Sequence, residues 1–174
     1  MRLAKLIEEF IADQGWEETV LRDEETGTSQ LETTMSINNQ NFLLYIEGNE
    51  RNELLFLYLY APFSVIDGKS VDAILLFNFI NDRFTNRGRI TVQDDGGIRY
   101  VEIIDLENIE PPIAIIDNML SSGIGMFKNN IEGIAAVALT QKTYEAIRTE
   151  YDKKDAAREL QKKNKESATD ESDE

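Results

Sequence analysis

The sequence predicts an α+β fold in which helices pack on an antiparallel sheet of about five strands. Helix and strand patterns do not alternate singly along the chain, which argues against parallel β-α-β units. Short polar turns join the successive strand patterns, as in antiparallel meanders. The predicted element order is α-β-β-β-α-β-β-α, and 174 residues suffice for one domain with its own core.

The first predicted element is an amphipathic helix over residues 1–14. Its apolar residues recur at the i, i+3, i+4 spacing that places them on one face of a helix. They are Leu3, Leu6, Ile7, Phe10 and Ile11. Gly15 is expected to end the helix, because glycine adopts the left-handed conformation that follows many helices. The acidic stretch 17–30 predicts turns.

Three strands are expected next, at residues 31–37, 42–47 and 54–60, with polar turns between them. The third is apolar on both faces, which is typical of the middle of a sheet. Pro62 is expected to end it, because proline has no backbone N–H for a sheet hydrogen bond. One face of this strand carries Leu55, Leu57 and Leu59, and the other carries Leu54, Phe56, Tyr58 and Tyr60.

A second helix is predicted over residues 71–84, with Ser70 as its N-cap. Its apolar residues run almost all round, which predicts that the helix is largely buried or used in an interface. Two strands follow at 87–93 and 98–105, joined by the Asp-Asp-Gly-Gly turn 94–97. Asp-Gly and Gly-Gly pairs favour this hairpin because they tolerate the positive φ of tight turns.

A long last helix is expected after the Pro111-Pro112 pair, which suits a first helical turn. Glycines such as Gly123 and Gly125 weaken it, so we expect a kink or break near 121–125. Its apolar residues keep a helical spacing over about seven turns. They are Ile113, Ile116, Leu120, Ile124, Phe127, Ile131, Ile134 and Ala138.

The predicted domain organisation is a single α+β domain over residues 1–151 and a charged C-terminal tail over 152–174. The tail contains one large aliphatic residue, Leu160. Such a segment has too little apolar surface to pack a core, so we expect it to be disordered in isolation, with residues 156–160 as the part that could extend the last helix. Its removal after Tyr151 should then leave the melting temperature nearly unchanged.

The charge balance excludes several classes of partner. The chain has 33 acidic and 18 basic residues, a formal net charge of −15. Nucleic-acid binding needs clustered Lys and Arg, and anionic membranes repel an acidic surface. Charged residues also interrupt the N-terminal helix, so residues 1–14 do not read as a signal peptide. We expect a cytoplasmic protein with no nucleic-acid or membrane partner.

The chain has no Cys and no His, which excludes thiolate nucleophiles, Cys/His zinc sites and Ser-His-Asp triads. Two sets of acidic residues are candidates for a function. The 94–97 turn could bind a cation, and Asp105, Glu107 and Glu110 could serve as general acids or bases. A hairpin turn and a helix N-terminus explain them more simply. We predict that the protein is not an enzyme and that it has no catalytic residue, bound metal ion or cofactor. The alternative is a small-ligand- or metal-dependent enzyme using Asp or Glu carboxylates.

Two other polar features have structural explanations. Asn78 and Asn81 share one face of the second helix, and we expect them to bond to neighbouring backbone rather than to a ligand. The run of small residues 121–125 lacks the lysine of a phosphate-binding loop. Close helix packing or a kink explains this run.

The most informative feature is a set of aromatic residues. Phe56, Tyr58 and Tyr60 alternate along the predicted central strand, and Tyr45 and Tyr100 are expected on the same side of the sheet. Tyrosine and phenylalanine are enriched in the cores of interfaces. If the helices cover only the leucine face, the aromatic side could accept a partner segment or a second subunit. If the long helix covers the aromatic side, these residues are core.

The block from Ile74 to Ile134 resembles the bacterial YbjN-like family. The similar stretches are LLFNFINDRF in the second helix, GRITVQDDGGIRYVEIIDL over the hairpin, and the long Ile- and Gly-containing helix. The resemblance implies a fold like that of type III secretion chaperones, which are small, acidic, usually dimeric and bind partner polypeptides. It also implies a regulator without established enzymatic activity. Our hypothesis is a non-enzymatic, chaperone-like or regulatory protein that binds a partner polypeptide and dimerises.

Overall fold

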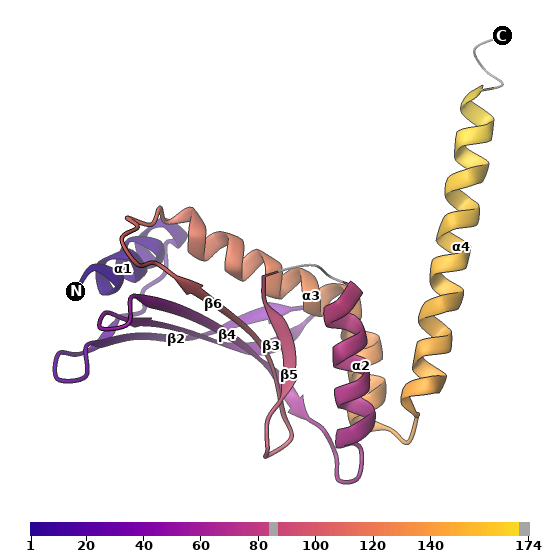
Figure 1. Cartoon of the computed structure of the whole chain (residues 1–174), viewed down its shortest axis with the longest axis horizontal. Helices are drawn as coiled ribbons and strands as arrows, with labels where there is room; N and C mark the ends of the chain where they lie inside the picture. The colour runs from indigo at the N-terminus through magenta and orange to yellow at the C-terminus, as the bar shows by residue number, and fades with distance from the viewer. Residues whose placement is uncertain (84–86, 171–174) are drawn as a thin grey trace.

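The computed structural model describes residues 1–83 and 87–170, with side chains described up to residue 162. This part of the chain consists of four helices and six strands, and Figure 1 shows how they are arranged. In chain order they are α1 (Arg2–Gln14), β1 (Leu21–Asp23), β2 (Thr28–Ile37), β3 (Gln40–Asn49), β4 (Leu54–Ser64), α2 (Ser70–Arg83), β5 (Arg89–Val92), β6 (Gly97–Asp105), α3 (Ala114–Leu139) and α4 (Tyr144–Asp170).

The strands form one antiparallel sheet in the order β1-β2-β3-β4-β6-β5, which confirms the predicted α+β class. The sheet has six strands rather than about five. The missed strand is β1, which lies where the sequence predicts only turns, because its three residues are all exposed and give no alternation of apolar and polar residues. As predicted, β4 lies inside the sheet, between β3 and β6.

Several strand and helix boundaries differ from the prediction. Strand β4 continues past Pro62 to Ser64, and its pairing with β6 shifts register between Tyr60 and Ser64. A shift of this kind accommodates a residue that cannot donate a backbone hydrogen bond. Helix α2 is described to Arg83, so the last residue of the predicted helix, Phe84, lies outside the described residues.

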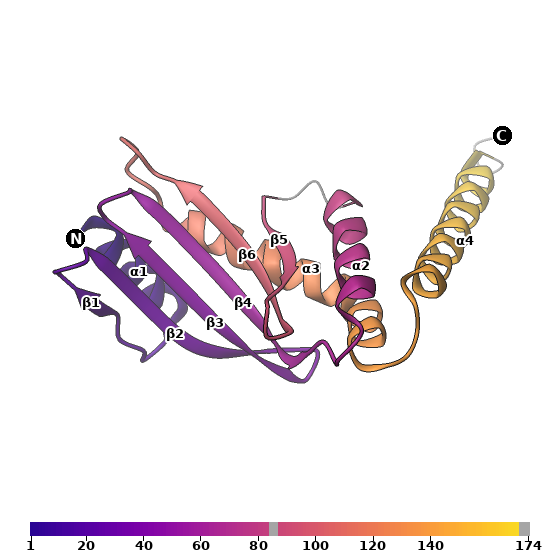
Figure 2. The same cartoon turned by 60° about the horizontal axis from the view of Figure 1, so that its bottom comes forward.

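Helices α1 and α3 lie together on one face of the sheet, as Figures 1 and 2 show. The leucine face of β4 is the buried one: Leu55, Leu57 and Leu59 are all fully buried. The five apolar residues predicted for α1 are buried as well, and Gly15 ends that helix with φ 67°. Helix α2 lies beside β5 and α3 at one end of the sheet, where Figure 2 shows it.

Of the kink or break predicted near residues 121–125, the break does not occur, because α3 runs without interruption from Ala114 to Leu139. Its glycine at position 123 instead permits close packing on the sheet. A Cβ at Gly123 would lie 2.8 Å from Cδ1 of the Tyr100 ring below it. The helical path breaks later, at residues 140–143, and α4 begins at Tyr144.

The charged C-terminal segment is helical in the structure as far as Asp170, which includes residues 156–160, the part expected as an extension of the last helix. Disorder of the segment in isolation stays a prediction. Asp155 forms an ion pair with Arg83 at 2.7 Å, and Lys154 forms one with Glu132 at 2.8 Å. Beyond these contacts, α4 extends away from the sheet (Figure 1). The domain boundary at residue 151 stays a prediction that truncation can test. No helix among residues 1–83 and 87–170 combines the length and apolarity that crossing a membrane would require.

Truncation after Tyr151 is expected to lower the melting temperature only slightly, by about 2–4 °C, because it removes surface ion pairs. Truncation after Thr143 should lower it much more, because this also removes Ile147, which is 1% exposed, and Tyr151, which packs on α3. Calorimetry on the two truncated proteins measures the difference. A large loss already at Tyr151 would show that residues 152–174 belong to the folded domain.

Candidate functional site

Four aromatic side chains gather on the sheet face opposite α1 and α3. Tyr45 on β3 lies directly across from Tyr58 on β4, with ring centroids 5.9 Å apart. Phe56 stacks on Tyr58 at 6.1 Å with an interplanar angle of 6°, and Tyr60 follows at 6.2 Å. Tyr58 is therefore the centre of a continuous cluster. We call these four residues the aromatic face.

The aromatic face is open to solvent. All four rings are half-buried, and the helices that pack on the described sheet, α1 and α3, lie on its opposite face (Figures 1 and 2). On β6, Val101 lies opposite Tyr58 and Ile103 lies opposite Phe56; Ile103 is 54% exposed. Neighbouring rings on adjacent strands stabilise each other, but rings that remain partly exposed leave apolar area for another molecule. Of the two alternatives for this face, the structure therefore supports the open one.

The prediction that Tyr100 belongs to this face is wrong. Tyr100 pairs with Leu59, so it points to the helix-covered side of the sheet and is fully buried. Arg99 opposes Tyr60 and takes the outer position instead. Which residues of β6 face the helices depends on the register between β6 and β4. The hairpin sequence alone does not specify this register, and a shift of one residue moves every side chain of the strand to the other face.

Tyr100 forms a buried polar pair with Glu102, two residues along the same strand. Its hydroxyl donates a 2.6 Å hydrogen bond to the Glu102 carboxylate, which is 1% exposed. Burial raises the pKa of Tyr100 well above its ordinary value, and the neighbouring Glu102 raises it further. Gly88 and Gly123 enclose the ring, since a Cβ at either glycine would lie less than 3.0 Å from it. The pair belongs to the core.

Charges flank the aromatic face on two sides. The Arg99 guanidinium carbon lies 5.0 Å from the centroid of the Tyr58 ring, within cation–π range. Glu47 on β3 lies opposite Phe56, on the other side of Tyr58. Burial, followed by the negative charge of Glu47, raises the pKa values of both Tyr58 and Tyr45. Both phenols therefore stay protonated and uncharged at neutral pH.

The carboxylates considered for catalysis or cation binding have roles in turns. Asp95 accepts a hydrogen bond from the Gly97 backbone at 2.9 Å, and Asp105 accepts one from Glu107 at 2.9 Å. Over the residues that the structure describes, no group of three or more Asp or Glu side chains gathers in a way that could hold a metal ion. The Asp95 contact supports the turn interpretation of residues 94–97. Asp105 also holds a turn rather than the helix N-terminus expected there, since α3 begins only at Ala114.

Asn81 has the structural role that the sequence predicted. Its side-chain amide donates to the Ile90 carbonyl at 2.9 Å, and its oxygen accepts from the Ile90 N–H at 2.8 Å. This pair of bonds occupies the backbone groups of Ile90 on the edge strand β5, where another strand would otherwise pair. Asn78 is exposed, so it does not share that role. Residues 121–125 lie inside α3 and form no loop.

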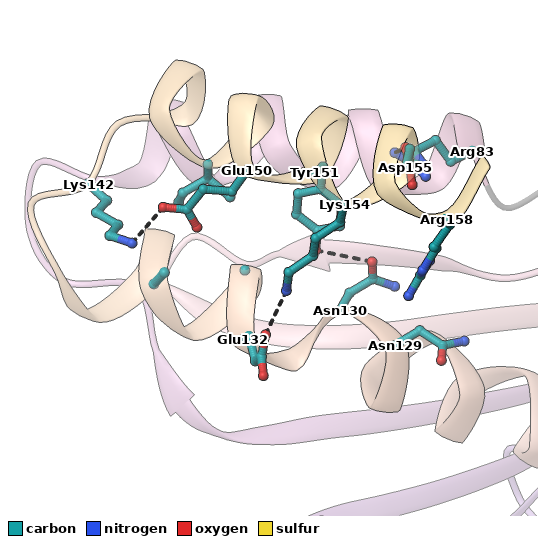
Figure 3. Close-up of a pocket in the computed structure, with 13 residues that line it drawn as sticks. Arg83, Asn129, Asn130, Glu132, Lys142, Glu150, Tyr151, Lys154, Asp155 and Arg158 are labelled. Atoms are coloured by element: carbon teal, nitrogen blue, oxygen red, sulfur yellow. Dashed lines mark hydrogen bonds and ion pairs between the residues drawn. The ribbon is translucent and has the colours of Figure 1, made fainter. Parts of the chain in front are cut away.

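A cleft of about 440 Å³ lies between α3 and α4 (Figure 3). Ion pairs close it, including Lys154 with Glu132 and Lys142 with Glu150. The Tyr151 hydroxyl donates to the side-chain oxygen of the buried Asn130 at 3.1 Å. The charged groups that line the cleft already pair with one another, and these ion pairs hold α4 against the rest of the domain. Few of these groups are therefore free to bind a ligand.

Helix α2 presents a second apolar surface. Its inner side is buried as expected, through Ala73, Leu76, Phe77 and Ile80. Its outer side carries Val71, Ile74 and Leu75, which are 70%, 45% and 42% exposed. The spacing of these three residues places them on one face of the helix. We call these three residues the α2 stripe. The sequence predicts either burial or an interface for this helix, and the structure buries its inner side and leaves an apolar surface on its outer side.

No protein-family model matches this chain, and no curated protein does. Among solved structures, a chain of the HopA1–SchA chaperone–effector complex is similar with a TM-score of 0.50 and 14% identity, over 74% of this chain and 91% of that one. The low identity makes this a likeness of fold alone. It supports the predicted chaperone-like fold and does not address the YbjN-like family.

Two other structures show weaker similarity. A chain of the ExsC–ExsE complex has a TM-score of 0.48 and 14% identity, over 74% of this chain and 92% of that one. A structure of the type III secretion chaperone SycH of Yersinia pestis with a fragment of YscM2 has a TM-score of 0.44 and 14% identity, over 68% of this chain and 91% of that one.

Proposed function

We propose that this protein is a non-enzymatic, chaperone-like binding protein of the cytoplasm. It holds a partner polypeptide on the aromatic face and forms a homodimer through the α2 stripe. The observation that carries the proposal is the cluster of four adjoining aromatic rings on a sheet face that no described helix covers. The YbjN-like resemblance of the sequence is consistent with such a role and stays part of the proposal.

The shape of the aromatic face favours a polypeptide over a small molecule. Small-molecule sites are usually concave and enclose most of the ligand. Here the rings of Tyr45, Phe56, Tyr58 and Tyr60 extend over two adjacent strands of a sheet. Aromatic side chains of this kind supply much of the contact area in protein interfaces, and the tyrosine hydroxyl groups add hydrogen bonds at the rim.

Charge and fold support the same class of partner. The net charge of −15 disfavours nucleic acids, which require clustered basic residues. The similar fold at a TM-score of 0.50 occurs in a complex described as one of a chaperone with an effector. A fold hosts many functions, so this likeness adds weight to polypeptide binding without identifying the partner.

The test is a crosslinked affinity capture from a lysate of the native cells, followed by mass spectrometry. It compares the wild type with Tyr58→Glu, which puts a charge at the centre of the aromatic face. We expect Tyr58→Glu to lose most of the captured partner, because the new carboxylate must be desolvated on binding. Circular dichroism establishes that each protein used in the comparison is folded.

Ser36→Glu is the matched control for this capture. Ser36 is exposed on β2 and lies on the same sheet face but outside the aromatic cluster, opposite Asn41. A polypeptide enriched by the wild type and by Ser36→Glu, but not by Tyr58→Glu, supports the proposal. Equal recovery with all three proteins contradicts it.

A further inference from the structure

Arg99 is a half-buried cation beside the centre of the aromatic face. One of its terminal nitrogens donates a long hydrogen bond of 3.4 Å to the Tyr60 hydroxyl. Its Nε is shielded from solvent and has no hydrogen-bond partner within the described part of the chain. A guanidinium has five N–H donors, so this side chain enters the aromatic cluster with most of its hydrogen-bonding capacity unused.

Arg99 has no carboxylate partner among the described residues. The eight ion pairs found there use other basic side chains, although acidic residues outnumber basic ones by 33 to 18. The Tyr58 ring holds the guanidinium instead, through a cation–π contact at 5.0 Å. A guanidinium held by a ring in this way keeps its remaining terminal N–H donors, which match the geometry of a carboxylate.

Glu47, which also lies on this face, is not placed to neutralise Arg99. It opposes Phe56, whereas Arg99 opposes Tyr60, so the two charges lie on different strands and four residues apart along the register. Tyr58 lies between them. The aromatic face therefore has negative charges on its β2–β3 side, where Glu32 lies opposite Tyr45, and positive charges, Arg99 and Arg89, on its β6–β5 side.

We infer that Arg99 is the polar anchor of the aromatic face and pairs with a carboxylate on the bound polypeptide segment. The inference rests on the proposed function. The polypeptide segment that the aromatic face selects carries one Asp or Glu among apolar residues. Its apolar side chains would cover Phe56 and Tyr58, and its carboxylate would pair with Arg99. A run of acidic residues is disfavoured, since a protein of net charge −15 repels it.

The test uses a library of random 12-residue peptides displayed on phage and selected on the immobilised full-length protein. With the wild type, we expect the enriched peptides to share one acidic position flanked by apolar residues. Arg99→Gln should weaken binding of the enriched peptides at least about tenfold, because the pair is partly desolvated. Selection on Arg99→Glu should replace the acidic position with Lys or Arg.

Arg89→Glu is the matched control. Arg89 lies on the neighbouring strand β5, opposite Val101, but it is exposed. The same change of charge there should leave the selected peptides unchanged if Arg99 is the anchor. Melting temperatures of the variants confirm that each protein used in selection is folded.

The outcomes separate this inference from the proposed function. Enriched apolar peptides that lose binding on Tyr58→Glu but share no acidic position would overturn the role of Arg99 and support the aromatic face as a docking site. Equally tight binding of the acidic peptides by Arg99→Gln and by the wild type would also overturn the role of Arg99 and leave the aromatic face as a docking site. Peptides that bind Tyr58→Glu as well as the wild type, or the absence of any enriched sequence, would contradict both proposals.

Discussion

Replacing Ile74 by Glu is expected to convert a homodimer into a monomer while leaving the helical and strand content unchanged. Ile74 is the middle residue of the α2 stripe, between Val71 and Leu75. Three neighbouring aliphatic side chains that are 42–70% exposed leave an apolar helix face in water, and a second copy of the same face would cover it. In a two-fold dimer, the substitution places one carboxylate from each chain in the same interface, where both must be desolvated and repel each other.

Light scattering coupled to size-exclusion chromatography measures this prediction. The wild type should elute with the mass of two 19.9 kDa chains, and Ile74→Glu with the mass of one. Circular dichroism shows whether the fold is kept. Because the stability of a dimer depends on protein concentration, the two proteins are compared at the same concentration.

Ile109→Glu is the control for this prediction, since Ile109 is 50% exposed and lies in the loop after β6, away from α2. It should remain dimeric, as should Tyr58→Glu. A dimer that survives Ile74→Glu and dissociates on Tyr58→Glu would show that the aromatic face, rather than the α2 stripe, joins the two copies. A monomeric wild type would contradict dimerisation altogether.

The parts of the fold that the sequence predicted are those where one strong periodic pattern decides the structure. The stripe from Leu3 to Ile11 can only be buried by a helix that packs on something apolar, and α1 packs in this way. The two-sided apolar pattern at 54–60 requires a strand with neighbours on both sides, and β4 has them. In both cases burial of apolar area outweighs the alternatives.

The errors arise where the structure depends on long-range contacts. The face occupied by Tyr100 depends on the register between β4 and β6, and Gly123 is tolerated in α3 because the Tyr100 ring lies directly beneath it. Propensity alone makes this glycine a weak point of the helix, whereas in the fold it serves the packing of the helix on the sheet. The exposure of Ile74 follows from the absence of any described element over that side of α2, which a sequence pattern does not reveal.

Replacing Tyr100 by Phe is expected to destabilise the protein by about 3 kcal/mol, or about 6–12 °C in melting temperature. The substitution keeps the ring that fills the space between Gly88 and Gly123, but it removes the hydroxyl that donates to Glu102. The other carboxylate oxygen of Glu102 already has no partner in the described part of the chain. A buried carboxylate would then have no hydrogen bond at all, which costs more than the hydrogen bond itself contributes.

The double variant Tyr100→Phe/Glu102→Leu tests the cause of this loss. If the cost comes from an unpaired buried charge, removing the charge together with the hydroxyl should restore most of the stability, because replacing both members of a buried polar pair by apolar groups is often nearly neutral. Urea unfolding of the wild type, both single variants and the double variant gives the interaction free energy of the pair. A Tyr100→Phe protein as stable as the wild type would mean that Glu102 finds other partners in solution. Such a result would contradict the exclusion of water from the core between α3 and β6.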